Sequence, residues 1–248
     1  MRISDTVGYL LNFAFPPRCI SCAEVLAIDY APPLCSDCTG GLCYAGSADV
    51  RDYSLYAYNS VTRRIIHACK YGGRPAYGRF LGERMAAHYH DILPRGLAVD
   101  AVIPVPLHAS KQRERGFNQA EVLARALCER LSLPLASDVL TRTRATDRQA
   151  FLDIHERRVN VDGAFAVRDT ADVRGKSFLL LDDIFTTGST IRSCANALLD
   201  AGAEQVSSYT AARANDPADH SENANELFTS HNNTNLSKNA NINDNLFR

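Results

Sequence analysis

The stretch from Phe178 to Thr190, FLLLDDIFTTGST, constrains the fold of this chain of 248 residues more than any other part of it. Its four consecutive apolar residues predict a strand buried on both faces, as in parallel sheets covered by helices. Two adjacent acids, Asp182 and Asp183, follow them. A hydroxyl-rich turn with Gly188 then leads into a helical pattern. We therefore expect a strand, a tight turn and a helix in succession.

Other parts of the chain repeat this succession, and the repetition predicts the fold class. An apolar run at residues 97–107 is followed by a loop and by an amphipathic helix at residues 117–131. A further strand-like piece follows Gly202. Strands that alternate with helices indicate an α/β domain with a mostly parallel sheet flanked by helices.

The composition bounds the number of domains and the class of protein. At 46% hydrophobic and 22% charged residues, the chain has enough apolar mass for a globular core. We expect the α/β domain at residues 58–213, a helix and a cysteine module at residues 1–57, and a disordered, Asn-rich tail at residues 214–248. With 27 basic and 28 acidic residues, no overall field draws the chain onto nucleic acid or a membrane. We see neither a signal peptide nor a spanning helix, so we expect a cytoplasmic protein with reduced thiols.

Four of the eight cysteines form two close pairs near the N-terminus. Two residues separate Cys19 from Cys22 and Cys35 from Cys38, and twelve residues separate the pairs. Two such pairs supply four thiolates in tetrahedral geometry, which is the ligand set of a structural zinc ion. The segment is too poor in aliphatic residues to build a core, so a bound ion would supply its folding energy. Two disulfides or four free thiols are the alternatives.

The turn after the paired acids predicts an anion site. It consists of Thr186, Thr187, Gly188, Ser189 and Thr190 at the start of a helix. Its backbone N–H groups and the positive end of the helix dipole suit a phosphate, and the glycine permits close approach. The neighbouring carboxylates would accept hydrogen bonds from hydroxyl groups, so a sugar phosphate fits the whole. The alternative is an ordinary strand end followed by a helix cap.

These residues resemble the signature of type I phosphoribosyltransferases. The cysteine pairs and the stretches VPLHASKQRERGFNQAEVLA and RQAFLDIHERRVNVDGAF narrow the resemblance to the ComF family of phosphoribosyltransferase-like proteins, with its GntX-type relatives and its link to DNA uptake in competent bacteria. The resemblance covers residues 8–213. It implies that phosphoribosyl pyrophosphate binds with magnesium, with Asp182 and Asp183 on the ribose hydroxyls and residues 186–190 on the 5′ phosphate. Of the second cysteine knuckle of many relatives, only Cys43 is present.

The basic loop between the apolar run at residues 97–107 and the helix expected at residues 117–131 suits a pyrophosphate. Residues 104–116 contain Lys111, Arg113 and Arg115 with a single acid. The family comparison identifies this segment as the pyrophosphate loop, and a solvated basic loop is the alternative. The comparison also assigns residues 142–158, which contain five arginines, to a flexible flap that closes over the substrate.

A basic and aromatic stretch precedes these elements. Residues 53–81 contain no acid, and their five Lys and Arg residues are interleaved with tyrosines. Such a stretch suits single-stranded DNA, with phosphates on the cations and bases on the rings. Core tyrosines beside a solvated basic face are the alternative.

Two functions of different classes fit these patterns. In the first, the protein is an enzyme in which a nucleophilic nitrogen attacks the anomeric carbon as pyrophosphate leaves. Asp182, Asp183 and Lys111 are then the catalytic candidates, and we find no separate general base. In the second, a non-catalytic DNA-uptake factor senses or tethers a nucleotide-like ligand in the pocket while the cysteine module and the basic stretch bind single-stranded DNA. The acceptor is open, and so is the oligomeric state, a homo-oligomer included.

Overall fold

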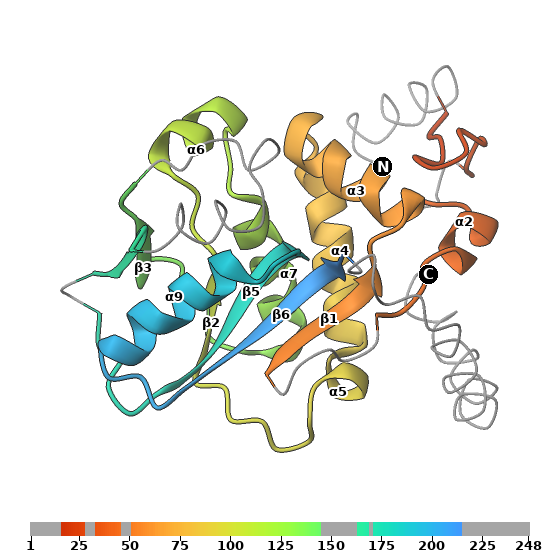
Figure 1. Ribbon diagram of the computed structural model, residues 1–248. Coiled ribbons are helices and arrows are strands. Elements are labelled where there is room, and N and C mark those ends of the chain that lie inside the picture. Colours follow the sequence, from red (N-terminus) through yellow and green to blue (C-terminus); the bar gives the residue numbers. More distant parts are fainter. Residues whose placement is uncertain (1–15, 28–32, 46–50, 145–162, 169–170, 215–248) are drawn as a thin grey trace, which may run out of the picture. The chain divides into compact units, whose positions relative to one another are not determined.

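The structure, a computed structural model, describes residues 16–27, 33–45, 51–144, 163–168 and 171–214 (Figure 1). Its main sheet is parallel and has the strand order β1-β6-β5-β2. The strands of this sheet are β1 (Asp52–Ala57), β2 (Ala101–Pro104), β5 (Ser177–Phe185) and β6 (Gln205–Arg213). The helices are α2 (Ser36–Gly40), α3 (Ser60–Tyr71), α4 (Pro75–Ala87), α5 (Tyr89–Ile92), α6 (Ala109–Arg115), α7 (Gln119–Leu131) and α9 (Ser189–Asp200). A parallel sheet flanked by helices confirms the predicted α/β class.

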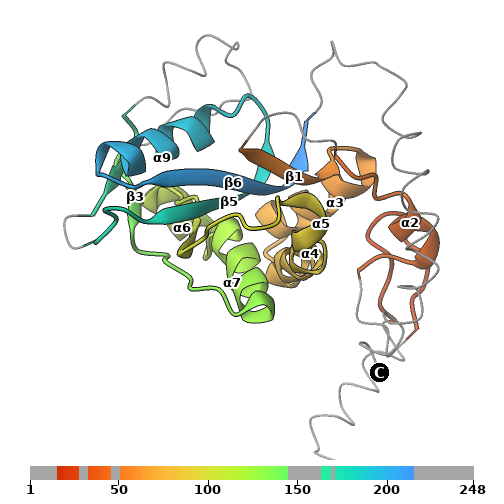
Figure 2. The same ribbon diagram turned by 90° about the horizontal axis from the view of Figure 1, so that it is seen from below.

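Alternate residues of β5 belong to two separate cores. Leu179 and Leu181 pack in a cluster that includes residues of α4 and α7. Phe178 and Leu180 pack in a second cluster with residues of α9. Figure 2 shows α9 on one face of the sheet and α4 and α7 on the other. A strand covered on both faces needs apolar side chains at every position, which explains the run of four.

The segment that contains the paired cysteines, here called the cysteine segment (described residues 16–27 and 33–45), covers the outer edge of β1. The backbone N–H of Ala57 donates to the carbonyl of Cys43 at 2.8 Å, and that of Ala45 donates to the carbonyl of Leu55 at 3.0 Å. An uncovered edge would present unpaired backbone groups. The sequence predicts that the α/β domain begins at residue 58. β1 ends at Ala57 and pairs with β6, so a strand of the main sheet precedes this boundary.

A small antiparallel hairpin lies between α7 and β5. It consists of β3 (Leu140–Arg142) and β4 (Phe165–Val167). The sequence predicted one long loop here, because strands of three residues are too short to show a period of two. Residues 145–162, which form most of the predicted flap, lie outside the described residues, as do the predicted N-terminal helix and the tail beyond residue 214.

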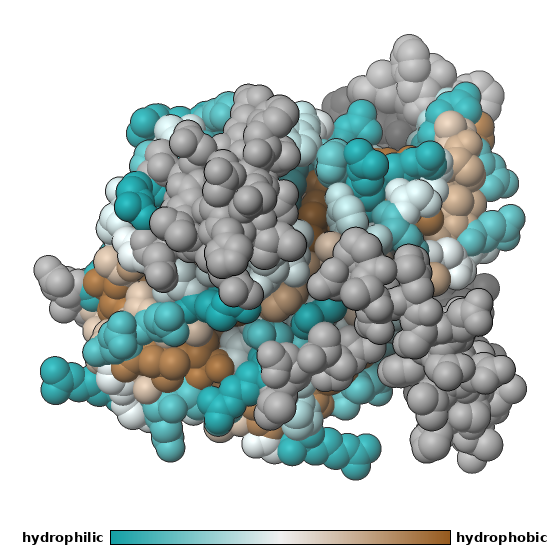
Figure 3. Space-filling view, viewed as in Figure 1, coloured by the Kyte–Doolittle hydropathy of each residue, from teal (hydrophilic) through white to brown (hydrophobic). Residues whose placement is uncertain are grey.

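The surface seen in Figure 3 is mainly hydrophilic, with smaller apolar areas, one of them around α9. Leu199 of α9 is 44% exposed.

Among the described helices, none has both the length and the apolar character needed to cross a membrane.

Candidate functional site

A cleft of about 850 Å³ lies at the carboxyl ends of β2 and β5. Open parallel sheets bind ligands at this edge. The lining residues come from the end of α3, the segment after β2, α6, the start of α7, β3, and the end of β5 with the turn behind it. Elements that are far apart in the sequence therefore meet around one space.

The paired acids lie in this cleft, opposite a lysine from α3. The side chain of Asp183 is 6% exposed, and its Oδ2 lies 2.7 Å from Nζ of Lys70, whose side chain is 18% exposed. A buried carboxylate needs such a partner, because an unpaired charge in a protein interior costs several kcal/mol. Lys70 is thus directed toward the acids, whereas the sequence predicts it only as one of the cations of the basic stretch at residues 53–81.

A sequence signal for Lys70 existed. It follows Ile66, a buried residue of α3, by four residues and so lies on the same face of the helix. A lysine on the buried stripe of a helix requires a buried partner of opposite charge.

The two acids and Lys70 shape one another's ionisation. Burial, together with the negative charge of Asp183, raises the pKa of Asp182 to about 7, and Lys70 opposes this rise. Burial alone would lower the pKa of Lys70, but the carboxylate of Asp183 outweighs it and the pKa is raised. Lys70 therefore stays charged at neutral pH, whereas the burial of Asp182 favours its protonated form.

The turn behind the acids has the backbone of an anion site. Gly188 caps α9 in the left-handed region, at φ 69°, and a Cβ at this position would lie 2.6 Å from Cζ of Phe185. Only glycine fits there. Thr186 and Thr190 line the cleft, and the helix N-terminus lies beside them. The other residues of the predicted set, Thr187, Gly188 and Ser189, lie between these two in the chain but are not among the lining residues.

The predicted basic loop contains a helix, α6, which the sequence analysis missed. His108 caps it, and Gly116 ends it in the left-handed region at φ 80°. Lys111 and Arg115 are four residues apart, so they share one face of α6, and both line the cleft. Arg113, two residues from each, is exposed and is not among the lining residues.

Arg115 is held in place from two sides. Its Nη1 donates to Oε1 of Gln119 at 2.9 Å, and its Cζ lies 5.3 Å from the ring centroid of Tyr71. Asn118 caps α7 through its side-chain oxygen, while its Nδ2 donates to the carbonyl of Val105 at 3.0 Å. The Gly-Phe-Asn-Gln stretch thus fixes both the segment after β2 and the direction of one cationic side chain.

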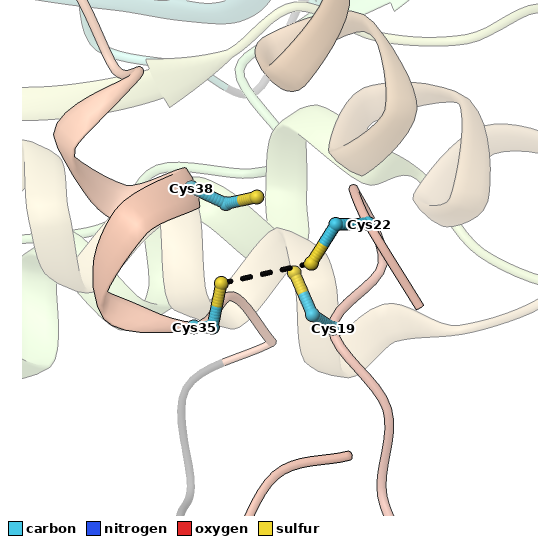
Figure 4. Close-up of side chains that lie close together, drawn as sticks. All are labelled: Cys19, Cys22, Cys35 and Cys38. Carbon is cyan, nitrogen blue, oxygen red and sulfur yellow. Dashed lines mark hydrogen bonds between the residues drawn. The ribbon is translucent and has the colours of Figure 1, made fainter. Parts of the chain in front are cut away.

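The four predicted metal ligands converge in a separate cluster (Figure 4). The Sγ atoms of Cys19, Cys22, Cys35 and Cys38 all lie within 4.8 Å of one another, and those of Cys22 and Cys35 are 3.7 Å apart. Sulfurs at tetrahedral positions 2.3 Å from zinc would be roughly 3.8 Å apart. Burial opposes ionisation of Cys19, but backbone N–H groups of Cys22 and Cys35 help to lower its pKa to about 6. The cluster could hold a zinc ion.

The cysteine segment is also tied to the helix that carries Lys70. Nδ2 of Asn59, the cap of α3, donates to the carbonyl of Gly41 at 2.9 Å. One turn further along, Nη1 of Arg64 donates to the carbonyl of Ser21. The amino-terminal half of α3 is therefore anchored on the cysteine segment, and its last turn lies in the cleft.

We expect Asp182→Asn to stabilise the protein increasingly as the pH rises. Because the pKa of this carboxyl is raised in the folded state, the stability due to its protonated form is complete below its ordinary pKa of 3.8 and is lost as the pH rises through about 7. The advantage of the variant should grow by roughly 1–3 kcal/mol between about pH 4 and about pH 8. Thermal unfolding at both pH values measures it.

The matched control is Asp172→Asn. This exposed carboxylate pairs with Lys176, which lowers its pKa, so the substitution should give no gain that grows with pH. An Asp182→Asn variant whose stability follows that of the wild type at every pH would contradict the raised pKa of Asp182.

Comparison with known proteins finds relatives of this chain among bacterial proteins. The DNA utilization protein YhgH of Shigella flexneri is 35% identical over 144 residues, which cover 57% of this chain and 63% of that protein. Competence protein F of Haemophilus influenzae is 33% identical over 54% of this chain and 58% of its own length. Competence protein ComFC of Bacillus subtilis is 27% identical over 64% of this chain and 63% of its own length. These relatives confirm the ComF-type resemblance, and the chain matches less than two thirds of the length of each.

A family model carries the comparison further. The model described as the phosphoribosyl transferase domain matches residues 115–239, which are half of the chain. The match includes the paired acids, the turn that follows them and α9. This protein therefore belongs to the phosphoribosyl transferase domain family.

Proposed function

We propose that the cleft binds phosphoribosyl pyrophosphate. One observation carries the proposal: Asp182 and Asp183 lie in the same cleft as a hydroxyl-rich helix N-terminus and as Lys111 and Arg115 of α6. A ribose, a 5′ phosphate and a pyrophosphate need these three chemistries together. Membership of the phosphoribosyl transferase domain family supports the same ligand.

Different residues of the cleft bind different parts of the ligand. The carboxylates of Asp182 and Asp183 accept hydrogen bonds from the ribose hydroxyls, and residues 186–190 bind the 5′ phosphate through backbone N–H and hydroxyl groups. Lys111 and Arg115 bind the pyrophosphate. Arg113 is not included, because it lies on another face of α6 than Lys111 and Arg115 and does not line the cleft.

The donor set of the cleft fits magnesium. Carboxylate oxygens and phosphate oxygens are the ligands that this ion takes in proteins, and Asp182 and Asp183 supply the former. When bound, magnesium would neutralise part of the charge of the pyrophosphate.

If the protein is an enzyme, a nitrogen nucleophile forms a bond to the anomeric carbon while the bond from that carbon to the pyrophosphate oxygen breaks. Lys111 and Arg115 receive the negative charge that develops on the pyrophosphate. Asp182 and Asp183 hold the ribose and stabilise the positive charge near the ring oxygen. Positioning and charge neutralisation supply the catalysis, without a general base on the protein.

The relatives named for competence and DNA utilization support a role of this chain in the uptake or use of DNA. The second candidate is a non-catalytic factor of that process which binds single-stranded DNA. Its support is the end of the basic and aromatic stretch: Tyr71 is 72% exposed, and Cζ of Arg74 lies 6.0 Å from the ring centroid of the half-buried Tyr77. Tyr53 and Tyr56, at its beginning, are buried in the core and are not available to a base. Pyrophosphate release on addition of nucleobases or amines favours the enzyme, whereas salt-sensitive DNA affinity without release favours the factor.

For the cysteine cluster we propose a structural zinc ion. Four thiolates complete a tetrahedral shell and leave no open position for a substrate. The ion would stabilise a segment that contributes few apolar side chains of its own.

Asp183→Asn is expected to abolish the thermal stabilisation that phosphoribosyl pyrophosphate with magnesium gives the wild type. A ligand at about one hundred times its Kd stabilises by about 2.7 kcal/mol, and the variant loses both a ligand contact and the charge that orients Lys70. Asp200→Asn, at the far end of α9, is the control and should keep the full shift. Equal shifts in Asp183→Asn and wild type would refute the proposed ligand site.

Elemental analysis is expected to find about one zinc ion per chain in protein purified without chelators. Cys22→Ser should lose the ion and lower the folding yield, because three thiolates leave the shell incomplete. Cys43→Ser, which removes an exposed thiol outside the cluster, should retain it. Wild-type protein without zinc would defeat the claim.

A further inference from the structure

The ion pair between Lys70 and Asp183 leaves one of the two ligand-binding acids already engaged. Nζ of Lys70 lies 2.7 Å from Oδ2 of Asp183, and both side chains are less than one-fifth exposed. An ammonium group therefore already pairs with one oxygen of a carboxylate that the proposed ligand would use. A ligand that uses Asp183 has to displace it or share the carboxylate with it.

We propose that Lys70 is an exchangeable internal counter-ion. Its ammonium neutralises Asp183 in the free protein and turns to the pyrophosphate group when phosphoribosyl pyrophosphate binds with magnesium, which leaves Asp183 for the ligand. This inference rests on the proposed function of the cleft.

The charges on the two sides of the exchange explain why it would need both ligands. Magnesium alone brings only positive charge, so it competes with the ammonium for Asp183 and separates Lys70 from the carboxylate that it pairs with in the free protein. Phosphoribosyl pyrophosphate brings the negative charge that the displaced ammonium needs. Magnesium replaces the ammonium at Asp183, and the pyrophosphate group gives the ammonium a new partner. Each ligand should therefore increase the affinity for the other.

The surroundings of Lys70 permit this movement of the side chain. Lys70 lines the cleft with Tyr71, and the guanidinium of Arg115 stacks on the ring of Tyr71 at 5.3 Å. A second cation is thus held close to the wall on which Lys70 lies, and together the two form a place for a polyanion. Lysine has a flexible stem of four carbons, so its ammonium can change partners without a change in the backbone.

The backbone of α3 is in turn well fixed. The side chain of Asn59 accepts hydrogen bonds from the N–H groups of Val61 and Thr62, and Thr62 Oγ1 accepts one from the N–H of Asn59. The further bond from Asn59 to Gly41 ties the helix to the cysteine segment. We therefore assign the exchange to the Lys70 side chain and not to a displacement of α3.

A purely structural ion pair makes a different prediction. Loss of Lys70 would then lower stability and would leave the affinity for phosphoribosyl pyrophosphate unchanged. As a counter-ion, Lys70 weakens magnesium binding in the free protein and strengthens the binding of phosphoribosyl pyrophosphate. The two affinities should therefore change in opposite directions when Lys70 is replaced.

Calorimetric titration of wild type and Lys70→Met tests this. For magnesium alone, the variant should bind at least tenfold more tightly, because Asp183 no longer has an internal partner. For phosphoribosyl pyrophosphate in the presence of magnesium, it should bind at least tenfold more weakly. Lys176→Met, which breaks the exposed pair with Asp172, is the matched control and should change neither affinity.

The outcomes separate the inference from the proposed function. Wild type that binds phosphoribosyl pyrophosphate, beside a Lys70→Met variant with unchanged magnesium affinity, overturns the exchange alone. Wild type that shows no binding of phosphoribosyl pyrophosphate overturns the proposed function and the exchange with it.

A measurement on the wild type covers the case in which Lys70→Met does not fold. The acetylation rate of Lys70 by an amine-reactive ester, followed by peptide mass spectrometry, reports whether its ammonium is engaged. Saturating magnesium alone should raise this rate at least threefold relative to that of Lys176, and phosphoribosyl pyrophosphate added with magnesium should lower it again. A rate that magnesium leaves unchanged overturns the exchange.

Discussion

Two carboxylates at the end of a buried strand need positive charge beside them, and the elements around the cleft meet this need. A buried carboxylate costs several kcal/mol unless a cation pairs with it or a proton neutralises it. At the end of β5 Lys70 pairs with Asp183, and the raised pKa of Asp182 favours the protonated form of that second acid. The last turn of α3 supplies Lys70 at 2.7 Å from Asp183, and one face of α6 supplies Lys111 and Arg115. The same cations make the cleft suitable for a ligand with several negative charges.

The cysteine segment contributes to this balance from outside the cleft. Its residues cover the edge of β1, and Gly41 and Ser21 accept hydrogen bonds from the amino-terminal half of α3. A helix of twelve residues is stiff, so an anchor at its first turns also determines where Lys70 at its last turn can reach. The cysteine segment therefore helps to determine the position of α3 at the cleft.

The elements that could be predicted from the sequence are those with a strong apolar pattern. β2, β5, α7 and α9 all have one, and all were expected. β6 was expected as well, although its centre is polar, with Ser207, Ser208 and Thr210. The hairpin of β3 and β4 was not, because each strand has only three residues. The helix α6 was expected as a loop, because none of its residues is buried and an exposed polar helix lacks the stripe by which a helix is recognised. β1 was assigned to the cysteine segment because it follows that segment directly.

By itself the sequence determined the local chemistry: the paired acids, the glycine turn behind them and the two cysteine pairs, because residues close in the chain are brought together by the backbone of one strand, turn or knuckle. Only the tertiary structure decided which cations face the acids. Of the five Lys and Arg residues between positions 53 and 81, Lys70 forms the pair with Asp183, more than a hundred positions away in the chain. Such a pair depends on how a helix docks against a sheet, and the docking is set by the packing of the core that α3 and β5 share and not by the neighbours of either residue.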